Sequence, residues 1–271
     1  MDEVTTSTPT RKEQRERARV ERQRREQEEA LRAQRKRRLM YLGGGLLVLI
    51  AAVAIAIAVA SGGGSSSSSS TGAGSGSGVT GASAVANEFA GIPQKGNTLG
   101  ASSAPATMMV FADMQCPYCK QFETQVFPSL VRRYVKTGKL KVVFQPIAII
   151  GSDSVTGARA VGSAAQQNKM FDYASLFYDN QGQENTGYVT QDFLTKLANA
   201  TPGLDTAKWK SQLNSPAVEN LLGQAQSASQ TAGVSSTPTF LVAKTGKPLQ
   251  QFQVTSLTPN AFYGKLDALT R

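Results

Sequence analysis

The sequence predicts an α/β domain with a long helical insertion, preceded by one transmembrane helix and a disordered linker. Three observations lead to this prediction. A Cys-Pro-Tyr-Cys segment, 116–119, lies between a short apolar run and a stretch with helical periodicity. An uncharged run of 22 residues, 39–60, lies near the N-terminus. Gly and Ser dominate the stretch that follows this uncharged run. The remaining part of the 271-residue chain is of single-domain size.

Residues 1–38 form a basic tail, with 13 Lys or Arg against 8 Asp or Glu and therefore a net charge of +5. The basic run 35–38 adjoins the apolar segment, which predicts a cytoplasmic location for this end. One interpretation of 11–38 is a helix that binds anionic lipid or nucleic acid. A solvated tail that only fixes the topology is the favoured alternative, because Glu residues interleave and apolar periodicity is absent.

Residues 39–60 are expected to form a single transmembrane helix, which would be about 33 Å long at ~1.5 Å per residue. A secretory signal peptide is the alternative, since Ala58-Val59-Ala60 resembles its cleavage site. The apolar region of a signal peptide is normally shorter, about 7 to 15 residues, which favours an uncleaved anchor. We therefore expect a single-pass protein of the cell membrane with the domain that follows the span outside the cytoplasm.

Residues 61–88 are predicted to be a flexible linker, because 61–83 contain almost only Gly, Ser, Ala and Thr. Such a composition cannot bury enough apolar surface to fold, and a random coil of this length reaches about 25 to 30 Å. The folded domain is expected at 89–271.

A strand, a helix and a second strand are predicted around the two cysteines. The apolar runs 107–112 and 140–144 suit buried strands. The intervening stretch places its apolar residues on one helical face before Thr137-Gly138 ends it: Phe122, Val126, Phe127, Leu130, Val131 and Tyr134.

Cys116 and Cys119 are predicted to be a redox dithiol. Cys116 would lie at a helix N-terminus, where unpaired N–H groups and the helix dipole favour a thiolate nucleophile. Pro117 suits the first helical position, and Cys119 lies one turn on as the resolving thiol. A structural disulfide would remove little loop entropy, and a metal site usually needs four ligands where this chain has two Cys and no His. We expect neither a metal nor a cofactor.

Two segments resemble a known family. Residues 111–122 resemble the active-site segment of thioredoxin-fold thiol oxidoreductases, in particular the membrane-anchored bacterial members of the DsbA-like family, and 234–242 resemble that family's cis-proline loop with its following strand. The resemblance implies that Pro238 is cis and that Thr237 and Pro238 bind an extended substrate chain. A trans proline in an ordinary turn is the alternative, and it is the commoner state of X-Pro bonds.

Roughly 90 residues separate the two segments, too many for a loop in a compact domain. The predicted helices are 158–167, 170–178, 191–197, 206–212 and 216–232. An insert at about 152–232 is similar to that of the DsbA-like branch and unlike the short crossover of plain thioredoxins. Strands are expected at 239–242 and 251–254, around a turn at 244–247, and a closing helix at 257–269.

The sequence departs from the family pattern at two positions. Val110 lies six residues before Cys116, where many DsbA-like chains carry a buried acid that assists proton transfer. Asp113 is the alternative candidate for proton transfer, although an exposed loop acid is an equal interpretation. Pro117 and Tyr118 are expected to tune the dithiol, and without a His beside it the potential should lie between about −120 mV for strong oxidants and about −270 mV for reductants.

The resemblance implies an extracytoplasmic thiol:disulfide oxidoreductase that donates its disulfide to reduced secreted proteins. Its expected partner is a quinone-linked membrane oxidant of the DsbB-like or vitamin-K-epoxide-reductase-like type. A tethered reductant or isomerase is the alternative, motivated by Pro117-Tyr118 and Thr237, and a non-catalytic peptide-binding holdase or adaptor is another. Nucleic-acid binding is not expected, because half of the net charge of +10 lies in the tail and no base-reading motif is present.

Overall fold

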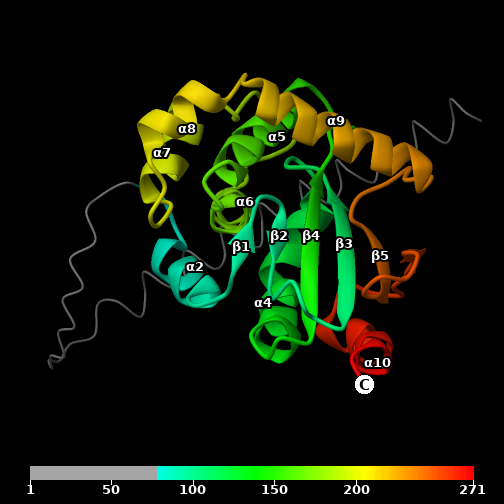
Figure 1. The fold of residues 1–271 in the computed structure, drawn as a ribbon. Coiled ribbons are helices and arrows are strands. Elements are labelled where there is room, and N and C mark those ends of the chain that lie inside the picture. Colours follow the sequence, from blue (N-terminus) through cyan, green and yellow to red (C-terminus); the bar gives the residue numbers. More distant parts are fainter. Residues whose placement is uncertain (1–77) are drawn as a thin grey trace, which may run out of the picture. The chain divides into compact units, whose positions relative to one another are not determined.

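A computed structural model describes residues 78–271 (Figure 1), which lie within one compact unit, Gly74–Arg271. The predicted basic tail 1–38, the predicted transmembrane helix 39–60 and linker residues 61–77 lie outside the described residues. Among the helices of residues 78–271, none has the length and apolar character needed to cross a membrane.

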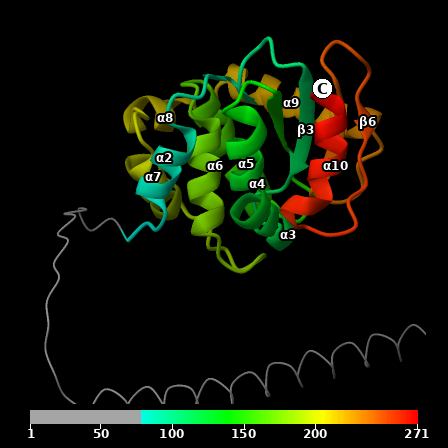
Figure 2. The ribbon, with the colours of Figure 1, turned by 90° about the horizontal axis from the view of Figure 1, so that it is seen from below.

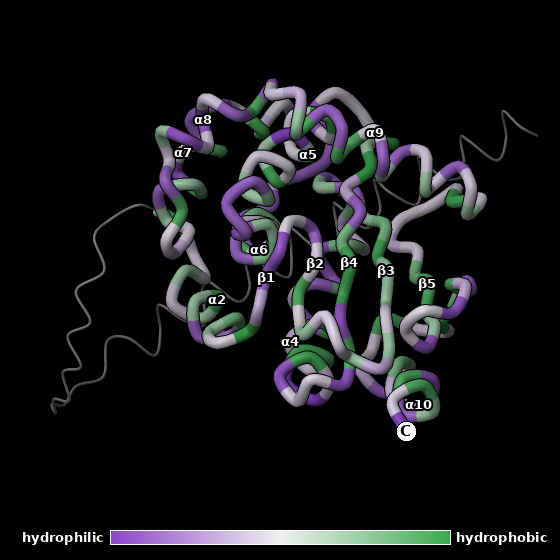
Figure 3. The backbone as a smooth tube through the Cα atoms, in the orientation of Figure 1, coloured by the Kyte–Doolittle hydropathy of each residue, from purple (hydrophilic) through white to green (hydrophobic). Residues whose placement is uncertain are grey.

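A six-stranded sheet forms the centre of the domain, with the strand order β1-β2-β4-β3-β5-β6. In chain order the strands are β1 (Gln94–Lys95), β2 (Thr98–Leu99), β3 (Ala106–Ala112), β4 (Leu140–Pro146), β5 (Thr239–Lys244) and β6 (Gln250–Gln251). The central strand β3 pairs in parallel with β4 and antiparallel with β5, so that Val110 lies opposite Phe144 and Phe240. The apolar runs predicted as buried strands are therefore the centre of the sheet, and Figure 3 shows hydrophobic residues concentrated there.

One face of the sheet is covered by the helical segment that follows β3, together with the C-terminal helix. These elements are α3 (Pro117–Gln121), η1 (Phe122–Val126), α4 (Phe127–Leu130), η2 (Val131–Val135) and α10 (Pro259–Leu269). Their aromatic side chains meet β5 at Phe240, whose ring centroid lies 4.8 Å from that of Phe122 and 5.0 Å from that of Phe262. This packing fixes the start of α3 relative to the sheet.

The stretch predicted as one helix from 116 to Tyr134 alternates between α-helical and π-helical turns. Pro128 has no N–H to donate to the carbonyl of Thr124, and its ring would crowd that carbonyl. The chain accommodates the proline with a π-helical turn before it, in which the N–H of Phe127 donates to the carbonyl of Phe122. The apolar face continues through the irregular turns, because Phe122, Val126 and Leu130 are all buried.

The predicted helical insert consists of α5 (Ser152–Ala165), α6 (Met170–Asp179), α7 (Gln191–Ala200), α8 (Thr206–Gln212) and α9 (Pro216–Thr231). The last of these covers the second face of the sheet, where Ala225 packs with Phe111 and Leu241. The helices α7 and α8 lie at the opposite end of the domain from α10 and β6 (Figure 2). An α/β fold with a helical insertion is confirmed.

The folded domain begins earlier than the predicted boundary at residue 89. Ala82–Phe89 forms helix α2, whose Val85 and Phe89 are buried, and the Phe89 ring contacts Phe171 of α6 at 6.3 Å between centroids. The predicted linker 61–88 is therefore too long at its C-terminal end, because two apolar residues spaced by one helical turn suffice to dock this short helix. The β1–β2 hairpin that follows was also not predicted.

Two predicted elements near the C-terminus are shorter than expected. The strand expected at 251–254 is limited to β6. Beyond it, Phe252 still donates through its N–H to the carbonyl of Phe240 at 2.8 Å, and its ring packs against Phe262 at 5.7 Å between centroids. The closing helix expected at 257–269 begins at Pro259, because Thr258 is its N-cap residue and proline occupies its first turn.

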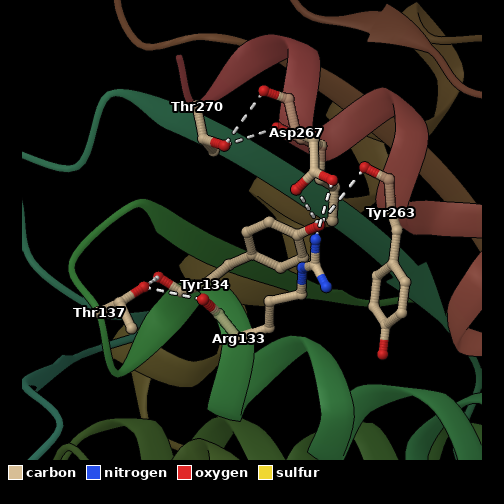
Figure 4. A network of polar contacts seen from close by, with 7 residues as sticks. Arg133, Tyr134, Thr137, Tyr263, Asp267 and Thr270 are labelled. Carbon is tan, nitrogen blue, oxygen red and sulfur yellow. Dashed lines mark hydrogen bonds and ion pairs between the residues drawn. The ribbon is translucent and has the colours of Figure 1, made fainter.

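A polar network holds α10 against η2 (Figure 4). The hydroxyl of Tyr134 donates to Asp267 at 2.6 Å, and Arg133 pairs with the same carboxylate at 2.9 Å. The Arg133 guanidinium also lies over the ring of Tyr263, 4.5 Å from its centroid. The C-terminal helix, which covers the sheet face behind the dithiol, is thus fixed by hydrogen bonds as well as by apolar contacts.

Candidate active site

Cys116 and Cys119 lie where β3 passes into α3, as predicted. Cys116 is the N-cap residue, with an extended backbone (φ −69°, ψ 121°), and its carbonyl accepts the first helical hydrogen bond from the N–H of Lys120 at 3.1 Å. Pro117 occupies the first turn, where its missing N–H costs no hydrogen bond. Both cysteines are free thiols, and both are buried, whereas Tyr118 between them is 63% exposed.

The pKa of Cys116 is lowered to about 6 from an ordinary value of 9.0. The largest cause is a hydrogen bond from the Cys119 thiol, and the Thr237 side chain and the backbone N–H groups of Tyr118 and Cys119 contribute in the same direction against the opposing effect of burial. Cys116 is therefore largely a thiolate at neutral pH, the state that a nucleophile needs.

Burial raises the pKa of Cys119 well above its ordinary value, and its contacts with Cys116 add to this effect. Cys119 is 1% exposed and lies on the buried side of α3. Two chemically different thiols thus stand one helical turn apart, and only Cys116 is poised to react as a thiolate at neutral pH.

The peptide bond between Thr237 and Pro238 is cis, which confirms the prediction for Pro238. This bond places the Thr237 carbonyl against the dithiol, where it accepts a hydrogen bond from Cys116 Sγ at 3.3 Å. The two segments singled out in the sequence, 121 positions apart, therefore form one site.

Asp113 is completely buried, so the interpretation of it as an exposed loop acid is wrong. One carboxylate oxygen accepts from the N–H of Gln115 at 2.8 Å, and the other accepts from the N–H groups of Ile149 and Ile150 at 2.8 and 3.1 Å. Asp113 thus ties the turn before Cys116 to the segment after β4. Val110 is buried within β3 and contributes no acid to the site.

Side chains of the helical insert hold the same turn, and sequence reasoning did not find them. The hydroxyl of Tyr178 donates to the carbonyl of Asp113 at 3.1 Å, and Gln181 donates to the carbonyls of Met114 and Cys116 at 2.8 and 3.2 Å. Each partner is more than 60 positions away in the chain, so no local pattern could have indicated it.

Helix α5 approaches the active-site turn closely at Gly157. A Cβ atom at this position would lie only 2.8 Å from the Cβ atom of Met114 and 3.3 Å from the ring of Phe177. Glycine is therefore the residue that lets α5 pack directly on the turn that carries the dithiol.

Glu123 is a buried acid one turn beyond Cys119, and it was also missed. Burial raises its pKa to about 8, an effect that Glu88 and Asp179 reinforce and that a hydrogen bond from the Ser175 hydroxyl opposes. It lies at a cavity of about 450 Å³ between α2, η1 and α6. The sequence could have indicated Glu123 through its spacing of four residues from Cys119, because this spacing places both side chains on the same face of a helix.

The thioredoxin family model matches residues 94–251, more than half of the chain. The chain belongs to this thioredoxin family. Its curated relatives include the probable disulfide bond formation protein D of Bacillus cereus, 29% identical over 150 residues that cover 54% of this chain and 68% of the relative. Disulfide bond formation protein D of Bacillus subtilis is 25% identical over 146 residues, covering 53% of this chain and 66% of the relative.

Solved structures of this thioredoxin-family fold include DsbA-like proteins. Oxidised BdbD from Bacillus subtilis superposes with a TM-score of 0.56 at 20% identity, covering 66% of this chain and 97% of the other. Wolbachia pipientis alpha-DsbA1 superposes with a TM-score of 0.55 at 18% identity, covering 64% and 90%. With a reactive Cys116 beside a buried Cys119, this member of the thioredoxin family is a thiol:disulfide oxidoreductase.

Proposed function

We propose that this thioredoxin-family chain is an extracytoplasmic disulfide donor, which passes its Cys116–Cys119 disulfide to reduced secreted or membrane proteins. The single observation that carries the proposal is the difference between the two thiols, with the pKa of Cys116 near 6 and that of Cys119 well above 9.0. A dithiol whose reduced form is stabilised in this way is a good oxidant, because reduction of its disulfide yields a stable thiolate.

The transfer takes place in two exchange steps. A client thiolate attacks Cys116 Sγ, the bond between the two cysteines breaks, and Cys119 leaves with the electron pair and takes up a proton. A second client thiolate then attacks the client sulfur of the mixed disulfide, and Cys116 leaves as a thiolate. The low pKa of Cys116 speeds this second step, because a thiol of lower pKa is the better leaving group. The client gains a disulfide, and the enzyme gains two electrons.

The surface around Cys116 suits an extended, partly apolar client. The carbonyl of Thr237 lies beside the sulfur, and an extended client would be held along the Thr237–Pro238 segment. The exposed large hydrophobic residues of the described part of the chain are Tyr118, Ile149 and Val155. Tyr118 lies between the cysteines, and Ile149 donates through its N–H to Asp113, so apolar surface adjoins the site.

The proposed location rests on the predicted span 39–60 and on the basic tail before it, which would leave the catalytic domain outside the cytoplasm. Newly exported proteins would arrive there with reduced thiols, and disulfides formed in an oxidising compartment would persist. A quinone-linked membrane oxidant of the DsbB-like or vitamin-K-epoxide-reductase-like type would regenerate the disulfide of the enzyme. The names of the Bacillus relatives, disulfide bond formation protein D, agree with this direction of transfer.

The full-length chain, purified in detergent, tests the chemistry. Its equilibrium with glutathione gives the reduction potential, and refolding of a reduced, disulfide-requiring client gives the direction of transfer. We expect the oxidised chain to oxidise the client in stoichiometric amounts, and Cys119→Ser, which cannot form the Cys116–Cys119 disulfide, to oxidise none. A potential near that of thioredoxin, about −270 mV, without client oxidation would show a reductant instead. Full refolding activity in Cys116→Ser would show a holdase.

The location is tested separately in cells that express the full chain. A membrane-impermeant maleimide should label Cys116 in intact cells after mild reduction. Labelling that requires cell lysis would place the dithiol in the cytoplasm and overturn the proposed compartment.

A further inference from the structure

The side chain of Gln181 bridges two carbonyl groups on either side of the active-site turn. Its Nε2 atom donates to the carbonyl of Met114 at 2.8 Å and to the carbonyl of Cys116 at 3.2 Å. Gln181 lies just after α6, in the loop of the helical insert that leads to α7. The insert thus contacts the backbone of the reactive cysteine itself.

Gln181 is held in place from two directions. Its backbone carbonyl accepts from Lys120 Nζ at 3.2 Å, one helical turn beyond Cys116, and its N–H donates to the carbonyl of Tyr178 at 3.2 Å. Because Lys120 belongs to α3, hydrogen bonds run in both directions between α3 and the insert loop. The carboxamide is therefore anchored rather than free to turn toward solvent.

A second glutamine ties the same loop to the turn from the other side. The Gln115 side chain accepts from the N–H of Asn185 at 2.8 Å and donates to the hydroxyl of Ser154 at 3.0 Å. The loop is thereby fastened at Gln181 and at Asn185, which keeps the Gln181 carboxamide over the two carbonyls.

This geometry affects the reduced and oxidised dithiol differently. A carbonyl oxygen carries the negative end of its dipole, and the carbonyl of Cys116 belongs to the same residue as the thiolate. The Gln181 NH₂ group offsets the two carbonyl dipoles and directs its positive end toward the turn. A thiolate gains from this arrangement in a site of low dielectric constant, whereas a neutral disulfide gains little.

We propose that Gln181 is a positioning residue for thiol–disulfide exchange, which acts through the carbonyls of Met114 and Cys116 to favour the thiolate of Cys116. The oxidising strength of the dithiol therefore depends on the helical insert as well as on the two residues between the cysteines. This inference deepens the proposed function and rests on disulfide exchange at Cys116, but it does not depend on the compartment.

The test compares the full-length chain with Gln181→Met, Gln181→Glu and the matched control Gln183→Met. Gln183 lies in the same loop and is exposed. Two quantities are measured: the ultraviolet absorbance of the Cys116 thiolate against pH, and the equilibrium constant with glutathione. Gln181→Met should lower the thiolate fraction near pH 6 and shift the glutathione equilibrium toward the disulfide by about two- to tenfold, the range that one hydrogen bond represents.

Gln181→Glu should shift both quantities further than Gln181→Met, because a carboxylate would face two carbonyl oxygens that it cannot satisfy. Gln183→Met should shift neither. A Gln181→Met variant with a lower melting temperature but an unchanged pH profile and glutathione equilibrium would overturn the proposal, because the role of Gln181 would then be structural only.

If Gln181→Met does not fold, Gln181→Asn decides the question. It keeps a polar carboxamide in the loop, but it is one methylene shorter and cannot reach both carbonyls. The glutathione equilibrium should move in the same direction, and an unchanged equilibrium would overturn the proposal. The potential of the unmodified chain tests the proposed function itself, so a failure of that function is distinguishable from a failure at Gln181.

Discussion

Cys116 Sγ lies 3.3 Å from the carbonyl oxygen of Thr237, the residue that precedes the cis proline. The same residue also lowers the pKa of Cys116 through its side chain. Thr237 therefore has two roles at one sulfur: its backbone orients the thiol, and its hydroxyl stabilises the thiolate. These roles are separable by substitution.

Replacement of Thr237 by valine should raise the pKa of Cys116 above about 6, because the isosteric side chain lacks the hydroxyl while the backbone carbonyl remains. The rate of alkylation of Cys116 by iodoacetamide near pH 6 should fall by about two- to fivefold, since one hydrogen bond is lost. Thr245→Val, beyond the far end of β5, is the matched control. Equal alkylation rates for Thr237→Val and the unmodified chain would show that the hydroxyl does not act on the sulfur.

The two thiols of the reduced protein should differ sharply in reactivity. Cys116 should be alkylated at a rate that rises through pH 6, whereas Cys119 should stay unmodified at neutral pH, because burial disfavours its thiolate. Peptide mass mapping after a brief treatment with iodoacetamide measures both sites. In denaturant the difference should vanish, and comparable labelling of both cysteines in the native protein would contradict the asymmetry on which the proposed function rests.

Replacement of Glu123 by glutamine should stabilise the fold at alkaline pH. The pKa of Glu123 is raised from 4.5 to about 8 in the folded protein, so its contribution to stability is present below 4.5 and is lost as the pH rises through 8. A neutral glutamine avoids that loss, and the variant should gain a few kcal/mol above pH 8, at about 1.4 kcal/mol for each unit of pKa shift.

Urea unfolding of the Glu123→Gln variant across this pH range measures the effect, with Glu184→Gln in an exposed loop as the control. Glu88, whose pKa burial raises to about 7, lines the same cavity and remains in the variant. Some pH dependence should therefore persist, and it should decrease further when Glu88 is also replaced. A constant difference in stability between Glu123→Gln and the unmodified chain at all pH values would contradict the assignment.

Replacement of Tyr134 by phenylalanine should lower the melting temperature by about 2 to 4 °C, the change typical of one lost interaction in a domain of this size. The buried hydroxyl donates to Asp267 at 2.6 Å, and its removal leaves α10 held by Arg133 and by apolar contacts. Tyr263→Phe is the control, because its ring, and not its hydroxyl, contacts Arg133 (Figure 4). An equal decrease in melting temperature for the two substitutions would show that the hydrogen bond from Tyr134 to Asp267 does not specifically stabilise the packing of α10.

The predictable parts of the site are those formed by residues that are adjacent in the sequence. Cys116 and Pro117 identify the start of a helix from the local sequence. Pro238 was predicted to be cis because its segment follows the cysteine segment in the same order as in the family that the sequence resembles. Both segments lie where the sequence placed them. The central strands were equally evident, because a largely buried strand reads as a mainly apolar run.

The unpredicted parts depend on contacts between distant segments. Asp113 in a loop looks like any solvated acid until the N–H groups of Ile149 and Ile150 are folded onto it. Helix α2 follows a Gly/Ser-rich stretch and has few apolar residues. It is ordered because these residues pack against α6, which the local sequence does not indicate. The π-helical turn before α4 depends on how the chain accommodates Pro128, which periodicity alone does not reveal.

The close approach of Gly157 to Met114 has a consequence for recombination and design. A graft of the Cys116–Cys119 motif onto a thioredoxin scaffold without the insert would remove the hydrogen bonds that Tyr178 and Gln181 donate to the carbonyls of the active-site turn. A chimaera that keeps the motif but takes a foreign α5 with any larger residue at position 157 would displace Met114 instead. The active-site turn of this chain and its own insert should therefore be transferred together.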